Sequence, residues 1–183
     1  NAGFSNINGD NRNWSTSGRL LYRQRLGKAG RTFSAMLNYS FSNNEMTGLN
    51  QSLTQIRDAE TAVWSDEIVN QRYDQNSKSS SLSGRLVYTE PLGHDFYLEA
   101  NYQYSWNKNT SYKNTFNSGS DLLDGGHLVF DPTGETLDEN YSNRISNMAQ
   151  NHRAGANISY QKEKFRAQLG ASYNPTITDN VTT

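Results

Sequence analysis

Residues 96–107 read Phe-Tyr-Leu-Glu-Ala-Asn-Tyr-Gln-Tyr-Ser-Trp-Asn, and their alternation decides the fold. Every even position from Phe96 to Trp106 is apolar or aromatic, and every odd position after Tyr97 is polar. Successive side chains of a β-strand point to opposite faces of its sheet. The stretch therefore predicts a strand with one apolar face and one polar face, about twice as long as an ordinary strand of 5–6 residues.

The same alternation occurs in two other stretches, and each of the three stretches follows a second alternating segment. The odd positions of 33–42 and of 165–174 are all apolar or aromatic, beginning at Phe33 and at Phe165. The preceding segments, 17–22, 83–88 and 154–160, contain Gly18, Gly84 and Gly155. This arrangement is an internal repeat of β-hairpins. Turn-forming residues occupy the three hairpin connections, at 27–31, 91–95 and 161–164.

The predicted fold class is therefore all-β, an antiparallel up-and-down meander of long hairpins. We expect hairpins at about 14–45, 79–108 and 148–175, joined by long polar loops at 46–78 and 109–147. Parts of the two long segments are also compatible with strands that continue past the apolar stripes. A short helix within 53–73 is an alternative, because residues 59–64 contain no helix breaker.

Composition excludes several classes of protein. Only 33% of the 183 residues are hydrophobic, and no run approaches the roughly 18 apolar residues of a transmembrane helix. The net charge of −1 provides no basic field for nucleic acid. Cysteine is absent, which excludes disulfide scaffolds and thiolate chemistry. Aromatic residues make up 11% of the chain, a content typical of an ordered protein.

Short turns at one end and long loops at the other are the layout of outer-membrane β-barrels. Such a barrel needs an apolar outer face bordered by two aromatic girdles. Phe33 to Phe41 covers roughly 26 Å at about 3.3 Å per residue, or about 20 Å at a tilt of 40°. The residues predicted to face lipid or form the girdles are Leu20, Tyr22, Phe33, Leu37, Tyr39, Phe41, Leu86, Tyr88, Phe96, Leu98, Tyr102, Tyr104, Trp106, Phe165, Leu169 and Tyr173.

The other face of the predicted strands is polar and would line the lumen of a barrel. It carries Arg19, Arg23, Arg25, Arg85, Glu99, Asn101, Gln103, Arg166 and Gln168. These side chains would hydrate a channel or contact a plug, and their pattern assigns no substrate.

Catalytic chemistry has little support in the sequence, so we expect neither an enzyme nor a cofactor. His94, His127 and His152 are scattered and lack metal-ligand spacing.

Candidates for ligand contact lie in the long segments. Trp64 and Tyr73 are able to stack on a ligand such as a sugar, although packing against their own strands is the simpler interpretation. Asp121, Asp124 and Asp131 belong to an acidic stretch that suits Ca²⁺, although a solvated loop is favoured over an ion site.

Three features mark about residues 12–175. They are the opening Ser-x-Ser-Gly-Arg-Leu-[Leu/Val]-Tyr at 15–22 and 81–88, the alternating return strands, and the long Asn/Asp-rich segments. In these features the chain resembles the β-barrel region of large outer-membrane receptors, the TonB-dependent type and its plugless relatives. This resemblance implies nutrient uptake across the outer membrane of a Gram-negative bacterium. It also implies outer-membrane lipid, a plug domain and an energy-coupling protein as partners.

Six expected strands are fewer than the eight of the smallest closed barrels. We therefore expect residues 1–183 to be a single fragment of a larger barrel, with no nucleic-acid partner. Its unpaired edges and apolar face predict that the isolated fragment self-associates. The alternative function is a soluble secreted β-sandwich that binds glycans or surfaces, because sandwich strands alternate in the same way.

Overall fold

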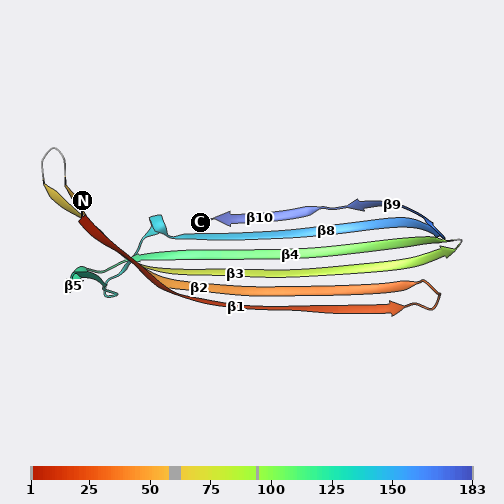
Figure 1. Cartoon of the computed structure of the whole chain (residues 1–183), viewed down its shortest axis with the longest axis horizontal. Helices are drawn as coiled ribbons and strands as arrows, with labels where there is room; N and C mark the ends of the chain where they lie inside the picture. Colours follow the sequence, from red (N-terminus) through yellow and green to blue (C-terminus); the bar gives the residue numbers. More distant parts are fainter. Residues whose placement is uncertain (1, 58–62, 94, 183) are drawn as a thin grey trace.

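The computed structural model describes residues 2–57, 63–93 and 95–182. They form one long antiparallel sheet in which each strand lies beside the next one in the chain (Figure 1). Its main strands are β1 (Ala2–Arg25), β2 (Thr32–Arg57), β3 (Trp64–Gly93), β4 (Phe96–Asn117), β8 (Asn143–Lys162), β9 (Phe165–Tyr173) and β10 (Thr176–Thr182). The short strand β7 (Thr136–Leu137) pairs with the end of β4. The expected all-β meander of long hairpins is confirmed.

The strands β9 and β10 together make the sixth strand, because both pair with β8 in one continuous register. Tyr173 pairs with Ala154, and Thr176 pairs with Asn151. Pro175 interrupts the strand because proline lacks the backbone N–H of a ladder bond. Its carbonyl still accepts a hydrogen bond of 3.0 Å from the His152 backbone N–H.

The short turns lie at one end of the sheet, as predicted. At the β1–β2 turn, Gly27 and Gly30 have positive φ angles of 67° and 88°, a region that glycine adopts without a Cβ penalty. At the β8–β9 turn, Glu163 has a φ of 46°. This end is called the turn end below, and the opposite end is called the loop end.

The segment 46–78 is mostly strand, so its prediction as a loop is wrong over most of its length. β2 continues to Arg57 and β3 begins at Trp64, with unbroken pairing between them. Neighbouring amides of these polar strands also bond directly: Gln51 Nε2 donates to Asn70 Oδ1 at 3.0 Å. The helix considered within 53–73 is contradicted at 53–57 and 64–73, which are strand, and residues 58–62 lie outside the described residues.

The segment 109–147 is also more ordered than a loop. β4 extends to Asn117, and β8 begins at Asn143. Between them lie β5 (Asp121–Asp124), β6 (His127–Phe130), β7 (Thr136–Leu137) and the 3₁₀ helix η1 (Glu139–Tyr141). β5 and β6 form a small hairpin of their own, which lies at the loop end (Figure 1).

The described residues form a single layer and have almost no hydrophobic core. Leu128, 5% exposed, is the only buried apolar residue among them. A β-sandwich requires two sheets packed face to face, and the small β5–β6 hairpin covers only the loop end of the long sheet. The sandwich expected as the alternative is therefore not the fold. No helix in the described part of the chain is long and apolar enough to cross a membrane.

Candidate membrane-spanning surface

The register places all sixteen residues predicted to face lipid on one face of the sheet, called the apolar face. Directly paired residues of neighbouring strands share a face. Tyr22 pairs with Ala35, Ala35 with Leu86, and Leu86 with Tyr102. The row continues through Ala154 to Tyr173. Three separate stripes of the sequence thus merge into one apolar band across six strands.

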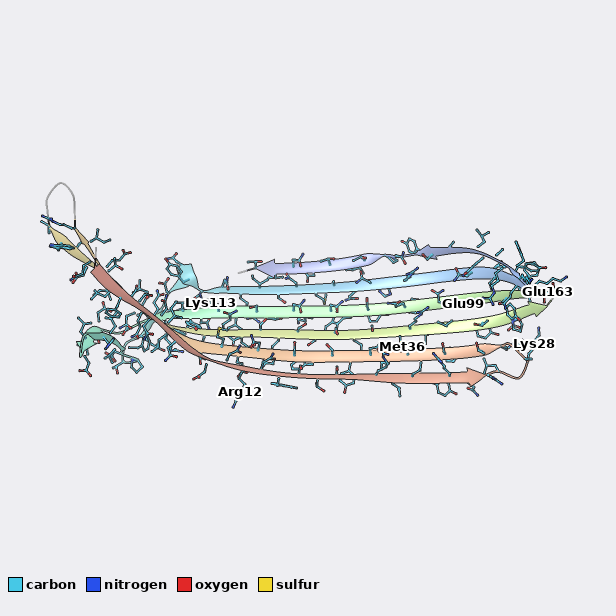
Figure 2. The ribbon with its side chains drawn as sticks, in the orientation of Figure 1. Arg12, Lys28, Met36, Glu99, Lys113 and Glu163 are labelled. Atoms are coloured by element: carbon cyan, nitrogen blue, oxygen red, sulfur yellow. The ribbon has the colours of Figure 1, made fainter. Side chains whose placement is uncertain are left out.

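Side chains project from the long sheet (Figure 2), and no second sheet covers the apolar band. Leu169 is 80% exposed and Tyr173 is 73% exposed, and Leu20, Leu86 and Ile158 are also exposed. A contiguous apolar surface of this kind on a folded protein marks contact with a partner or a membrane.

Aromatic residues border the band at the turn end with one residue from every strand. This turn-end line consists of Tyr22, Phe33, Tyr88, Phe96, Tyr160 and Phe165. Three neighbouring pairs of rings in the line are in contact, and Tyr22 with Phe33 is one of them. The centroids of Phe96 and Tyr160 are 4.8 Å apart, and those of Tyr160 and Phe165 are 6.0 Å apart. Aromatic rings with polar tips suit the boundary between lipid tails and headgroups.

A second line borders the band at the loop end. This loop-end line consists of Trp14, Phe41, Leu82, Trp106, His152 and Tyr173. Trp14 and Phe41 are in ring contact at 5.1 Å. His152 is partly buried beside Tyr104 and forms a 2.8 Å hydrogen bond with the Tyr102 hydroxyl. The imidazole therefore takes an aromatic position in the line.

The turn-end line does not run straight across the strands. The pairing row that starts at Phe33 reaches β9 at Ala171 after four inter-strand steps. The residue of β9 that belongs to the turn-end line is Phe165, six residues nearer the turn end. Six residues are about 20 Å along a strand, and four steps are about 19 Å across the sheet. The turn-end line is therefore inclined at roughly 45° to the pairing rows.

The loop-end line has the same inclination. The row that starts at Phe41 meets β10 at Asp179, whereas the aromatic residue of the last strand is Tyr173, again six residues nearer the turn end. The two borders are thus parallel and oblique. Strands of membrane barrels are tilted by about 35–45° from the membrane normal. Residues that lie at one depth in the membrane therefore form a line that is inclined by about this angle to the pairing rows, and the two membrane borders form two parallel lines.

The sixteen predicted residues do not include four residues of the two lines, which are Trp14, Leu82, His152 and Tyr160. The period-two stripes contain the signal for all four. Counting back in twos reaches Trp14 from Gly18, Leu82 from Gly84 and His152 from Ala154, and counting forward from Ala154 reaches Tyr160. The stripes thus extend past the windows in which the alternation is strongest.

Trp64 and Tyr73 lie on opposite faces of β3, so the structure does not bring them together. Trp64 pairs with Arg57 near the tip of the β2–β3 extension and is 54% exposed. The Tyr73 ring packs over Gly48 and Gly9, its neighbours on β2 and β1. Packing against its own strands, the simpler interpretation, is what Tyr73 shows.

The acidic residues singled out in the sequence do not converge either. Asp121 and Asp124 stand at the two ends of exposed β5. The Asp131 carboxylate accepts hydrogen bonds from the Thr133 backbone N–H at 2.8 Å and the Ser120 hydroxyl at 2.9 Å. These bonds hold the pKa of Asp131 below its ordinary value. Across the described ranges, no three acidic or histidine side chains are grouped in a way that could hold a metal ion.

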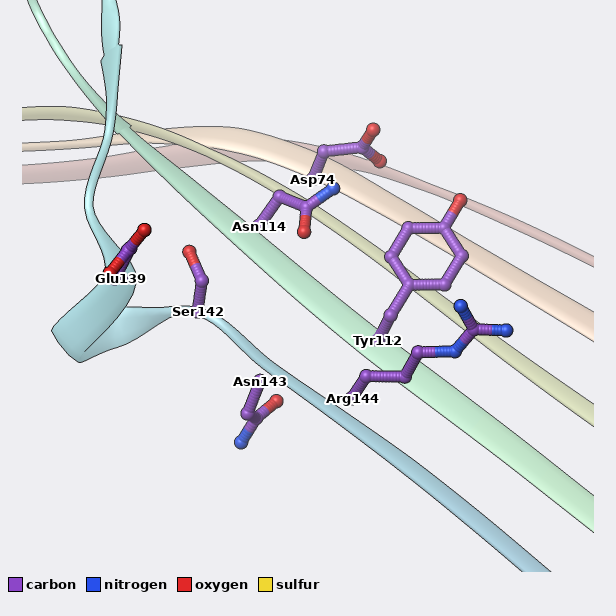
Figure 3. A pocket seen from close by; sticks show the side chains of 7 residues that line it. All are labelled: Asp74, Tyr112, Asn114, Glu139, Ser142, Asn143 and Arg144. Atoms are coloured by element: carbon purple, nitrogen blue, oxygen red, sulfur yellow. The ribbon is translucent and has the colours of Figure 1, made fainter. Parts of the chain in front are cut away.

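A shallow polar pocket of about 540 Å³ opens on the apolar face beyond the loop-end line. Asp74, Tyr112, Asn114, Asn143 and Arg144 of the long strands line it, together with Glu139 of η1 and Ser142, which follows η1 (Figure 3). Tyr112 and Arg144 are directly paired across β4 and β8. Charges of both signs line this pocket, so it has no single electrostatic preference.

Comparison with known proteins identifies the family. The model of the outer membrane protein beta-barrel family matches residues 24–182. No curated protein matches the chain. A solved structure of a KdgM porin in complex with disordered oligogalacturonate shares 10% identity over 98% of this chain and 96% of that chain, at a TM-score of 0.15, which supports no conclusion about this chain. Given the family match over most of its length, the chain belongs to the outer membrane protein beta-barrel family, a family of the Gram-negative outer membrane.

Proposed function

We propose that the chain supplies six neighbouring wall strands of an outer-membrane barrel that takes up a nutrient. The observation that carries the proposal is the pair of parallel oblique lines that border the apolar band. The segments between the lines, such as 33–41 and 165–173, are the membrane-spanning parts of the strands. The apolar face contacts lipid, and the polar face lines the lumen.

The wall extends beyond these strands. Within the described residues, β1 pairs only with β2, and β9 and β10 pair only with β8. Lipid offers no hydrogen bonds to an open sheet edge, and the smallest closed barrels have eight strands. Further strands of the same barrel pair with both edges.

The transport role follows from the polar face and from the resemblance to large outer-membrane receptors. In that resemblance, energy passed from the inner membrane drives the uptake, and a plug domain and an energy-coupling protein are the partners. The wall strands themselves do no chemistry; they hold the lumen open and carry the external extensions of β2, β3 and β4.

A matched pair of arginine substitutions in the full-length protein tests the assignment of the two faces. Leu169 lies midway between the two lines on the apolar face, and Gln168 is its neighbour on the polar face. Arginine on the lipid face at mid-membrane costs about 2–4 kcal/mol, and lumen positions tolerate it. We expect Leu169→Arg to reduce strongly the amount of folded barrel in the outer membrane and Gln168→Arg to leave it unchanged. Equal effects of the two substitutions would contradict the assignment.

Nutrient uptake is tested in cells. A strain that lacks the full-length protein and its parent strain are compared across a panel of radiolabelled nutrients. We expect the mutant to lose the uptake of at least one of them, and a protonophore to stop that uptake in the parent. Uptake that persists with the protonophore would identify a passive barrel.

A further inference from the structure

The polar face carries an excess of arginine that the composition of the chain conceals. The whole chain has 17 basic and 18 acidic residues. Between the turn end and the loop-end line, however, the polar face carries a single acidic residue, Glu99. Its basic residues there are Arg19, Arg23, Arg25, Arg85, Arg153 and Arg166. The acidic residues of the chain lie mainly on the apolar face, in the turns and in the loops.

None of these arginines is neutralised by a carboxylate within the described residues. The ion pairs there involve Lys28 and Arg31 with Glu90, and Arg72 with Glu135. All six arginines are exposed. Arg19 donates from Nε to the Asn38 side chain at 2.9 Å, a neutral partner that orients the guanidinium without cancelling its charge.

The arginines also occupy successive depths of the wall. Arg23 and Arg166 adjoin the turn-end line, at Tyr22 and Phe165. Arg19 and Arg85 lie between the two lines, and Arg153 adjoins the loop-end line at His152.

Arg85 and Arg153 share one pairing row, with only Gln103 of β4 between them. Two inter-strand steps separate their Cα atoms by about 10 Å. That spacing allows one small solute with two anionic groups to contact both arginines.

We propose that this polar face guides anionic solutes, carboxylates or phosphates, through the lumen of the barrel. Arginine is always charged, and its planar fork matches carboxylate and phosphate oxygens. Rings of arginine and lysine line pores that select anions and phosphates. A series of unpaired arginines from one membrane border to the other provides a cation at each level of the path. This inference rests on the proposed wall function and adds the substrate class to it.

The test measures ion selectivity of the whole barrel, with the plug domain of the proposed function removed, in planar lipid bilayers under a KCl gradient. We expect the wild type to favour Cl⁻ over K⁺ by about threefold or more. The triple variant Arg19→Gln, Arg85→Gln, Arg153→Gln should lose about two- to threefold of that ratio. The control is Arg12→Gln, because Arg12 is exposed on the apolar face beyond the loop-end line, and it should keep the wild-type ratio.

The outcomes separate this inference from the proposed function. Channels with no anion preference, or a preference unchanged in the triple variant, would overturn the inference and leave the wall function standing. Folded barrels without the plug that insert but do not conduct would overturn it as well, because the arginines would then line no open path. Failure of the wild-type protein to insert into lipid at all would overturn the proposed function.

Discussion

At the scale of single residues, a cluster of ion pairs lies at the turn end, just outside the apolar band. The Arg31 guanidinium contacts both carboxylate oxygens of Glu90 at 2.7 Å, and the Tyr88 hydroxyl donates a third hydrogen bond. Lys28 adds a weaker contact at 4.0 Å. The bond from Arg31, followed by the bond from Tyr88, lowers the pKa of Glu90 from 4.5 to about 2.

This shift predicts how stability depends on pH. The folded protein holds Glu90 ionised, so the unfolded chain binds the proton more readily. The contribution of Glu90 is then fully present above pH 4.5 and is lost as the pH falls from 4.5 towards 2. We expect Glu90→Gln to be less stable than the wild type at pH 7 and to approach it near pH 2, as measured by urea unfolding of the full-length protein in lipid vesicles.

Glu163→Gln is the control for this prediction. Glu163 lies in the β8–β9 turn, and none of the ion pairs found among the described residues includes it. We expect its stability to follow the wild type at every pH. A difference between Glu90→Gln and the wild type that stays constant down to pH 2 would contradict the lowered pKa.

Two glycines on the long strands differ in what surrounds them. A Cβ added at Gly48 would meet the carbonyl oxygen of Asn8 and the Tyr73 ring, whereas a Cβ added at Gly84 would meet open space. We expect Gly48→Ala to destabilise the protein by about 1–3 kcal/mol through overpacking. Gly84→Ala should be neutral or stabilising by up to about 1 kcal/mol, because alanine restricts the unfolded chain. Equal unfolding free energies for the two variants would refute the packing of Tyr73 over Gly48.

At the scale of elements, the sequence predicted the strands wherever apolar residues alternate. Phe33 to Phe41 and Phe96 to Trp106 are strands with the expected faces. The loop-end extensions were missed because their pairs are polar: Asn50 faces Gln71, and Gln51 faces Asn70. Backbone hydrogen bonds and side-chain amide pairs stabilise these strands in place of apolar contacts. Strands stabilised in this way cannot be predicted from hydrophobic periodicity.

The β5–β6 hairpin is held to the sheet by two buried amides, and this contact is open to test. Gln51 Nε2 donates to the Leu128 carbonyl and Asn70 Nδ2 to the Val129 carbonyl, both at 2.9 Å. Gln51 is 6% exposed and Asn70 is 5% exposed. Removing such a bond costs about 1–3 kcal/mol. We expect Asn70→Ala to accelerate amide hydrogen exchange across residues 121–130 of the full-length protein by roughly 10- to 100-fold.

The matched control for this prediction is Gln55→Ala. Gln55 also lies on β2 and bonds Asp66 at 3.1 Å, but the bond is exposed and makes no contact with the hairpin. Exchange across 121–130 should stay at the wild-type rate in this variant. If Asn70→Ala and Gln55→Ala exchange alike, the hairpin is held by other contacts.

At the scale of the whole molecule, the sheet is open and its apolar face is uncovered. β1 and β10 end the sheet on either side, and the described residues have no core that would hide the band. We expect the isolated 183-residue chain in detergent-free buffer to form oligomers or larger aggregates, because unpaired edges and apolar faces associate. Light scattering after size exclusion measures this directly. A monodisperse monomer without detergent would show that the face is compatible with water.

The barrel architecture was only partly predictable from the chain. The apolar stripes and short turns pointed to a membrane barrel, but the oblique course of the two borders depends on the pairing of strands far apart in sequence. Phe33 and Phe165 belong to the same border only because Tyr88, Ala100 and Ala156 connect their strands in register. Arginines of the polar face that are far apart in sequence, such as Arg85 and Arg153, are likewise brought into one row only by strand pairing.

The central claim is that the apolar face contacts lipid between the two aromatic lines. The most direct test is spin labelling of single cysteines at 166–172 in the full-length barrel in lipid vesicles, and this segment has no native cysteine to interfere. We predict that accessibility to oxygen, which concentrates in lipid, peaks at Ala167, Leu169 and Ala171. Accessibility to a water-soluble nickel chelate should peak at Gln168 and Gly170. Equal access of the chelate to both sets of positions would contradict the claim.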